Sequence, residues 1–246
     1  MRGGKALVHV EIRNEAKDAV RDAAVLLDSW IRGGAVKRLI VAAGITPLPL
    51  YEEIARREVP ADDLDIYILD EYVGVPRADL RTCTNLLRRT VAEAWGVASD
   101  RFFGLSSEER DAEARVVEHE RRIAGAGGLD GIVLGLGKNG HLGFNEPGSE
   151  AGSTARVIEL DPVSTEANRL WFGGEHAPRL GATVGLGAIL AARHVLLLAF
   201  GAAKADAVRA MVRGPRSASC PASFLQGHQN AHVFLDRAAA EQIGLG

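Results

Sequence analysis

Residues 131–148, with the sequence GIVLGLGKNGHLGFNEPG, join a short apolar segment to a long glycine-rich one. The run Gly131–Leu136 is typical of a strand that is buried on both faces of a parallel sheet. Its continuation contains the G-x-G-x-x-G pattern of a dinucleotide-binding turn, but that pattern requires a helix to begin inside it. Glycine, asparagine and proline follow instead between residues 143 and 148, and these favour a loop. We therefore expect a long polar loop at a strand end rather than a dinucleotide site.

Similar apolar runs recur along the chain, and segments with helical periodicity separate them. Strands are predicted over Ala6–Ile12, Arg38–Ala43, Asp65–Leu69, Gly131–Leu136, His194–Phe200 and Ala231–Leu235. Helices are predicted over Glu15–Ile31, from Pro47, over Thr82–Trp95, from a Ser106–Glu109 capping box to Ala124, and over Ala202–Arg213. This alternation predicts one α/β domain over residues 1–246: a Rossmann-like, doubly wound, mostly parallel sheet with helices on both faces.

The composition excludes several classes of partner. Of the 246 residues, 47% are hydrophobic and 25% charged, and the net charge is -3. Lysine and arginine are scattered, so we expect no nucleic-acid partner, and no apolar run is long enough to span a membrane. The two cysteines, Cys83 and Cys220, form no disulfide framework or metal-ligand cluster, so we expect no metal and a cytoplasmic protein.

Polar or glycine-rich residues follow two further strands. The segment Gly44-Ile45-Thr46-Pro47 leads from a strand into a helix, where free backbone N–H groups favour an anion such as phosphate. An ordinary strand-to-helix turn is the alternative. Asp70 and Glu71 end a buried strand, where Asp70 is placed to act as a general base. The alternative is a pair of solvated loop acids or a helix cap.

The loop after Leu136 carries Asn139, His141, Asn145 and Glu146. A neutral imidazole can take up a proton, and a nearby carboxylate can orient it and stabilise the imidazolium, so the His141–Glu146 spacing indicates proton transfer. Lys204 follows another strand, in the first turn of the next helix. A cation there opposes the helix dipole unless an anion binds beside it, and an exposed surface lysine is the alternative.

Five segments, in order along the chain, resemble the glucosamine-6-phosphate deaminase family. They are GITP at 44–47, LDEYVG at 69–74, GLGKNGHLGFNEPG at 135–148, TVGLG at 183–187 and FGAAK at 200–204. The loop motif, together with PASFL at 221–225, is most similar to the galactosamine-6-phosphate isomerase branch. The resemblance implies an amino-sugar-phosphate isomerase/deaminase domain that converts galactosamine 6-phosphate or glucosamine 6-phosphate to a ketohexose 6-phosphate plus ammonia, with the galacto form preferred and without a cofactor.

The resemblance also implies roles for the residues singled out above. His141, supported by Glu146 and Asn139, would move the proton that opens the sugar ring. Asp70 would then carry a proton between C2 and C1. The 6-phosphate would be held by backbone groups of Ala43, Gly44, Ile45 and Thr46 and by the Lys204 ammonium.

The sequence departs from the family pattern at three places. The family often has Thr-Gly-Gly-Thr where this chain has Ala43-Gly44-Ile45-Thr46. A phosphate-binding arginine of some members has no aligned counterpart; Arg169, one position away, and Arg179 are the candidates. Ile158 replaces a lysine of the effector site in allosteric members, which predicts no such activation. The implied partner is a small-molecule sugar phosphate, and a homo-oligomer is possible.

Two other functions share this fold. The 6-phosphogluconolactonases hydrolyse a sugar-phosphate lactone, but their loop lacks the FNEP continuation found here at 144–147, so Glu146 is the discriminating residue. Sugar-phosphate-sensing modules of bacterial repressors follow an N-terminal helix-turn-helix. Here the first strand is predicted near Ala6, which leaves no room for one.

Overall fold

The computed structural model describes residues 8–244, and within them a main sheet of seven strands has the order β1-β10-β9-β6-β2-β3-β5. Every neighbouring pair is parallel. The strands are β1 His9–Arg13, β2 Arg38–Val41, β3 Asp65–Ile68, β5 Phe102–Phe103, β6 Gly131–Gly135, β9 His194–Ala199 and β10 Ala231–Asp236. The predicted parallel sheet is thus confirmed, although the first two residues of the predicted first strand lie outside the described residues.

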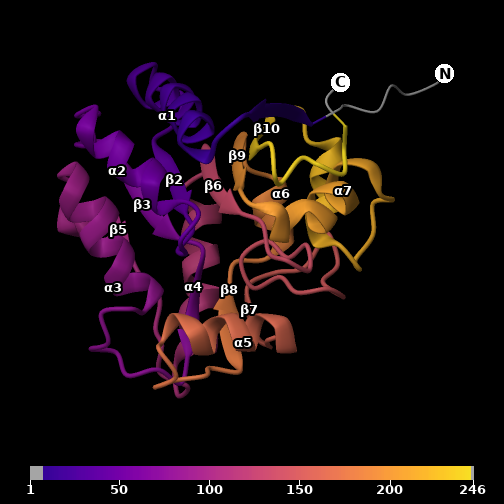
Figure 1. Ribbon diagram of the computed structural model, residues 1–246. Coiled ribbons are helices and arrows are strands. Elements are labelled where there is room, and N and C mark those ends of the chain that lie inside the picture. The colour runs from indigo at the N-terminus through magenta and orange to yellow at the C-terminus, as the bar shows by residue number, and fades with distance from the viewer. Residues whose placement is uncertain (1–7, 245–246) are drawn as a thin grey trace.

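Helices cover both faces of this sheet (Figure 1). One face carries α1 Ala16–Arg32, α2 Leu48–Arg56 and α3 Cys83–Leu87, which continues as a π-helical turn over Arg88–Glu93; the other carries α4 Ala112–Gly125, α6 Leu186–Leu190 and α7 Ala205–Arg213. Successive side chains of a strand point to opposite faces. In β2, therefore, Leu39 and Val41 pack into the first layer while Ile40 packs into the second. The doubly wound prediction is confirmed.

A second, antiparallel sheet was not predicted. It has the order β4-β8-β7, with β4 Asp70–Val73, β8 Leu180–Thr183 and β7 Arg156–Glu159. Helix α5, Pro162–Trp171, follows β7, and Figure 1 shows it beside this small sheet at the lower end of the molecule. The strands have four residues each, and β4 begins with two carboxylates, which strands disfavour. Local propensity therefore gave little signal for them.

The strand order places a crevice between β2 and β6. From β2 the chain proceeds outward to β3 and β5, whereas β6 lies on the other side of β2 and leads to β9 and β10. Ligands of open α/β sheets bind at the carboxyl ends of the strands at such a reversal of order. Residues 42–47 follow β2 and residues 136–148 follow β6, so both predicted motifs lie at this point.

The predicted capping box at Ser106–Glu109 is wrong. Helix α4 begins only at Ala112, with Asp111 as its N-cap residue. The Ser106 hydroxyl instead donates to the Asp111 carboxylate at 2.5 Å, and the Ala112 N–H donates to the carbonyl of Glu108. The first turn is therefore ordered by the backbone of Glu108. Within residues 8–244, no helix combines the length and apolar character that crossing a membrane requires.

Candidate active site

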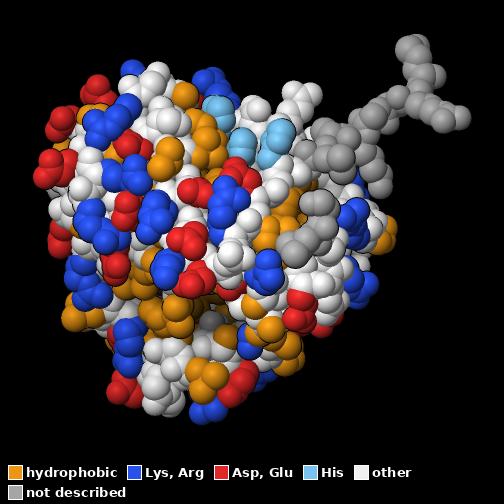
Figure 2. Space-filling view, turned by 45° about the horizontal axis from the view of Figure 1, so that its top comes forward, with side chains coloured by type: hydrophobic (Ala, Val, Ile, Leu, Met, Phe, Trp, Pro, Cys, Tyr) orange, Lys and Arg blue, Asp and Glu red, His pale blue; other side chains and the backbone are white. Residues whose placement is uncertain are grey.

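A cavity of about 570 Å³ opens at the carboxyl ends of β2, β3 and β6. Its walls include Asp70, His141, Lys204 and the segment 43–46, so one space receives residues from four separate stretches of chain. Helix α5 forms a further wall with apolar and polar side chains. In Figure 2, the visible face carries interspersed positive and negative side chains, with a recess bordered by hydrophobic side chains in its lower half.

Asp70 is the first residue of β4, where the chain leaves the main sheet directly after β3. Its side chain is almost buried, with 8% of the residue exposed, and it lines the cavity. Burial raises the pKa of Asp70 from 3.8 to about 8, and the neighbouring charge of Glu71 adds to this effect. The alternative of solvated loop acids is therefore wrong. A carboxyl group with this pKa can both take up and release a proton near neutral pH.

The carboxylate of Glu71 is bonded to the protein backbone and has a structural role. Its Oε1 accepts hydrogen bonds from the backbone N–H groups of Tyr72 at 2.8 Å and Cys83 at 2.9 Å, and its Oε2 accepts one from Thr84 at 2.8 Å. These bonds occupy the free N–H groups at the start of α3 and tie that helix to β4. Glu71 therefore fixes the strand that carries Asp70.

His141, Glu146 and Asn139 form one hydrogen-bonded group. Glu146 Oε2 lies 3.0 Å from His141 Nδ1 and accepts a bond of 2.8 Å from the Asn139 side-chain amide. A carboxylate only accepts, so Nδ1 carries the imidazole proton and Nε2 is left as the proton acceptor. Burial alone would raise the pKa of Glu146, but the bonds from His141, Ser164 and Asn139 lower it below its ordinary value. Glu146 is thus held ionised beside the histidine.

Ser164 is a member of this group that the sequence did not indicate. It lies in α5, with 4% of the residue exposed, and its hydroxyl is 3.3 Å from His141 Nδ1. No motif marks it, because it lies 18 residues beyond Glu146 in a segment for which no element was predicted. Only the packing of α5 against the loop brings the two together.

Asn145, the other polar residue of the loop, does not line the cavity. It is fully buried, and its amide group donates to the carbonyls of Leu142 at 3.0 Å and Val184 at 2.9 Å. Its oxygen accepts a bond of 3.1 Å from Arg156. These bonds brace the loop against β7 and the segment after β8, so Asn145 holds the shape in which His141 faces the cavity.

The glycine turn and Lys204 also line the cavity. Gly44 has φ +117°, a conformation that favours glycine, and it starts the turn that leads into α2. Lys204 ends a 3₁₀ turn, Ala202–Lys204, just before α7, and its ammonium donates to the carbonyl of Leu136 at 2.6 Å. Burial lowers the pKa of Lys204, and the nearby Lys138 lowers it further. A bound anion would relieve both effects.

Neither candidate arginine lies in the cavity wall. Arg169 pairs with Glu166 at 2.7 Å, and Arg179 pairs with Glu159 at 3.4 Å, with all four side chains exposed. Both guanidinium groups therefore lie on the surface beside local acids. Lys204 is the predicted phosphate-binding cation that the structure brings to the cavity.

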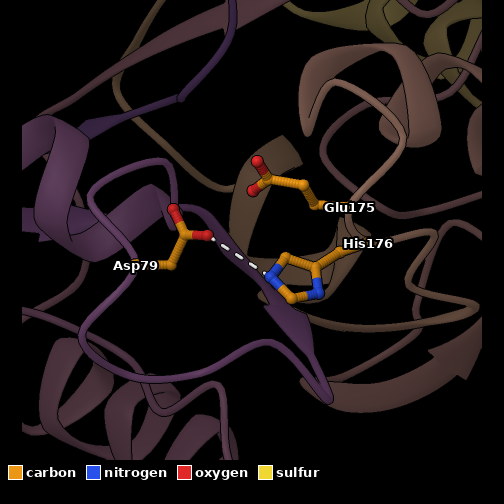
Figure 3. A group of neighbouring side chains, drawn as sticks. All are labelled: Asp79, Glu175 and His176. Atoms are coloured by element: carbon orange, nitrogen blue, oxygen red, sulfur yellow. Dashed lines mark ion pairs between the residues drawn. The ribbon is translucent and has the colours of Figure 1, made fainter.

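Among the described residues, one group brings together three side chains of the kind that bind metals: Asp79, Glu175 and His176 (Figure 3). His176 Nε2 lies 3.5 Å from Asp79 Oδ2. The guanidinium of Arg81, however, already donates to both carboxylates, including two bonds of 2.9 and 2.7 Å to Asp79. The group is an ion-pair network that fastens the segment after α5 to the loop before α3.

The fold and the cavity together define a doubly wound α/β protein with a site equipped for acid–base catalysis. A carboxyl group and a histidine–glutamate pair face the same cavity. Residues 13–234 match the family model described as glucosamine-6-phosphate isomerases/6-phosphogluconolactonase. The chain belongs to this family.

Individual relatives agree with this assignment. A glucosamine-6-phosphate deaminase from Streptomyces avermitilis is 43% identical over 211 residues, covering 83% of this chain and 81% of the relative. One from Corynebacterium kroppenstedtii is 38% identical over 238 residues, covering 95% and 92%. The solved structure of a monomeric glucosamine-6-phosphate deaminase superposes with a TM-score of 0.90 at 29% identity, covering 95% of this chain and 99% of that one. A 6-phosphogluconolactonase from Trypanosoma cruzi has a TM-score of 0.80 at 19% identity, covering all of both chains, which shows the shared fold.

Proposed function

We propose that this protein converts an amino-hexose 6-phosphate to a ketohexose 6-phosphate and ammonia. The observation that carries the proposal is the meeting of Asp70, the His141–Glu146 pair and Lys204 in one cavity. The names of the relatives at 38% and 43% identity support the same activity.

Ring opening is the first step. The proton on the C1 hydroxyl of the cyclic sugar must leave, and the ring oxygen must gain one, so that the C1–O5 bond breaks and an aldehyde forms. His141 Nε2 is the group that takes and returns this proton, because Nδ1 is committed to Glu146. Asn139 and Ser164 hold Glu146 and the imidazole in place while the histidine is charged.

Isomerisation and loss of ammonia follow. Asp70 removes the proton from C2 of the open-chain sugar, which gives an enolamine, and then returns a proton to C1. The resulting C2 imine adds water, and ammonia leaves as the C2 ketone forms. A single carboxyl group can carry a proton between adjacent carbons, and its pKa of about 8 suits both directions of transfer.

The 6-phosphate is assigned to the turn and to Lys204. In the proposal, backbone groups of Ala43, Gly44, Ile45 and Thr46 donate to the phosphate oxygens, and the Lys204 ammonium exchanges its bond with Leu136 for one with the phosphate.

The lactonase function is the main competitor, because the family description includes both activities. Lactone hydrolysis needs an activated water but no proton transfer between two carbons. The burial of Asp70 and the Glu146 brace of His141 favour the deaminase. The sensor-module function lacks a supporting observation of this kind.

Ammonia release from glucosamine 6-phosphate and galactosamine 6-phosphate, assayed separately with purified protein, tests the proposal. We expect turnover of both epimers, with the galacto form used more efficiently and yielding tagatose 6-phosphate. That preference comes from the sequence resemblance, and the relatives named above carry the gluco name. Hydrolysis of 6-phosphogluconolactone without ammonia release from either amino sugar would refute the deaminase function. A cytoplasmic location and a homo-oligomer stay predictions.

A further inference from the structure

A second cavity has a volume of about 470 Å³. Glu71, which follows Asp70 in β4, forms part of its wall. The cavity is bounded by the segments around α3, by residues 104–107 and by the beginning of α4. Three arginines line it, Arg77, Arg88 and Arg115. Its volume falls within the range of roughly 300–1,000 Å³ that is usual for small-molecule sites.

The two acids of this cavity already have partners. Both oxygens of Glu71 accept backbone N–H groups, as described above, so the start of α3 offers no free anion site. Asp111 accepts from the Ser106 hydroxyl at 2.5 Å and lies 3.5 Å from Arg115. The negative charges are therefore engaged by the protein itself.

The arginines of this cavity are less fully paired with groups of opposite charge. Among residues 8–244, no carboxylate lies within 4.0 Å of a guanidinium nitrogen of Arg77 or Arg88. Arg88 stacks over the Phe102 ring, with 4.8 Å from its guanidinium carbon to the ring centre, which holds it near the cavity without neutralising it. Ser107 also lines the cavity, with 3% of the residue exposed.

We propose that this second cavity is a binding site for a phosphorylated sugar or polyol. Arg77 and Arg88 supply charge-assisted hydrogen bonds to the phosphate, and guanidinium groups suit this because they present several donors in one plane. Ser107 takes a sugar hydroxyl, because the hydroxyl groups of Thr82, Thr84 and Ser106 are already bonded within the protein. The site is separate from the proposed active site, because none of these residues lines the first cavity.

The proposal is tested by calorimetric titration of glucose 6-phosphate, which has no amino group to lose. The full-length protein carries Lys204→Ala, so that phosphate binding in the first cavity is weakened. We expect one saturable site to remain. Arg88→Ser and Arg77→Ser, each added to Lys204→Ala, should weaken it by about tenfold or more, the usual effect of losing a charge-assisted hydrogen bond.

Arg89→Ser is the matched control. Arg89 is the next residue along the same helical segment and is also exposed, but its guanidinium donates to the carbonyl of Leu80 and does not line the cavity. It should leave the affinity unchanged, and unphosphorylated glucose should not bind. The proposal is overturned if Lys204→Ala alone abolishes all binding at millimolar glucose 6-phosphate. It is equally overturned if Arg77→Ser and Arg88→Ser both bind as tightly as the control. Because the readout is binding, these outcomes do not depend on deaminase activity.

Discussion

Replacing Asp70 by asparagine should abolish most of the activity and at the same time stabilise the folded protein. The carboxyl group is buried beside Glu71, and its pKa rises from 3.8 to about 8. An acid with a raised pKa binds its proton more tightly in the folded state than in the unfolded state. Its contribution to stability is therefore fully present below about pH 4 and is lost as the pH rises towards 8.

The size of the effect follows from the two pKa values. One pKa unit corresponds to about 1.4 kcal/mol, so the ionised Asp70 costs on the order of 5 kcal/mol of folding free energy above pH 8. Asparagine is neutral and removes this cost, but its amide is itself buried and costs about 1–3 kcal/mol where it lacks partners. We expect a net gain of roughly 2–4 kcal/mol at about pH 8.5, shrinking towards zero or below near pH 5.

Guanidinium chloride unfolding of wild type and Asp70→Asn at several pH values measures this difference, and ammonia release measures turnover. Turnover should fall by roughly two to four orders of magnitude, as is usual for loss of a general base, while sugar-phosphate binding persists. Asp65→Asn, at the other end of the same stretch of chain, is the control and should show neither effect. A stability difference that does not grow with pH would refute the assignment of a raised pKa, and near-normal turnover would refute the role as base.

Four further predictions concern the same cavity. His141→Gln should lower turnover of the cyclic amino sugar by about 10²–10⁴-fold, with partial rescue in the reverse reaction from the ketose phosphate and ammonia. Lys204→Ala should weaken phosphorylated ligands by about 1.5–3 kcal/mol and leave residual binding of the unphosphorylated sugar almost unchanged. Ser164→Ala should lower kcat by up to about tenfold, the value of one hydrogen bond, with little change in KM, and Ser164→Thr should restore it. A chelator should leave activity intact.

Each of these has an outcome that would contradict it. Wild-type kinetics of His141→Gln with the cyclic substrate would remove this residue from ring opening. Equal losses for phosphorylated and unphosphorylated ligands would make Lys204 structural. A Ser164→Ala effect confined to KM would mean that the hydroxyl contacts substrate rather than the His141–Glu146 pair. Activity lost to a chelator and regained with a divalent ion would show a metal requirement.

The sequence by itself determined the main architecture and indicated part of the first cavity's wall: Asp70, His141, Lys204 and residues 43–46. The apolar runs of β2, β6 and β9 are continuous because both faces of each strand are buried, and that pattern is visible without coordinates. Parallel strands have their carboxyl ends at one edge of the sheet, so residues that follow different strands, such as Asp70 and His141, were expected to meet. The crevice between β2 and β6 is where they do.

The tertiary structure alone decided the small sheet, the place of α5 and the partners of individual side chains. Strands of four residues acquire their stability from pairing with distant segments, as β4 does with β8, so their own sequences carry little signal. The same holds for Ser164, whose contact with His141 depends on how α5 packs, and for Arg169 and Arg179, which pair with exposed acids outside the cavity. The different surroundings of the two adjacent carboxylates also depend on the tertiary structure: backbone N–H groups of Cys83 and Thr84 hold Glu71, whereas Asp70 lines the cavity.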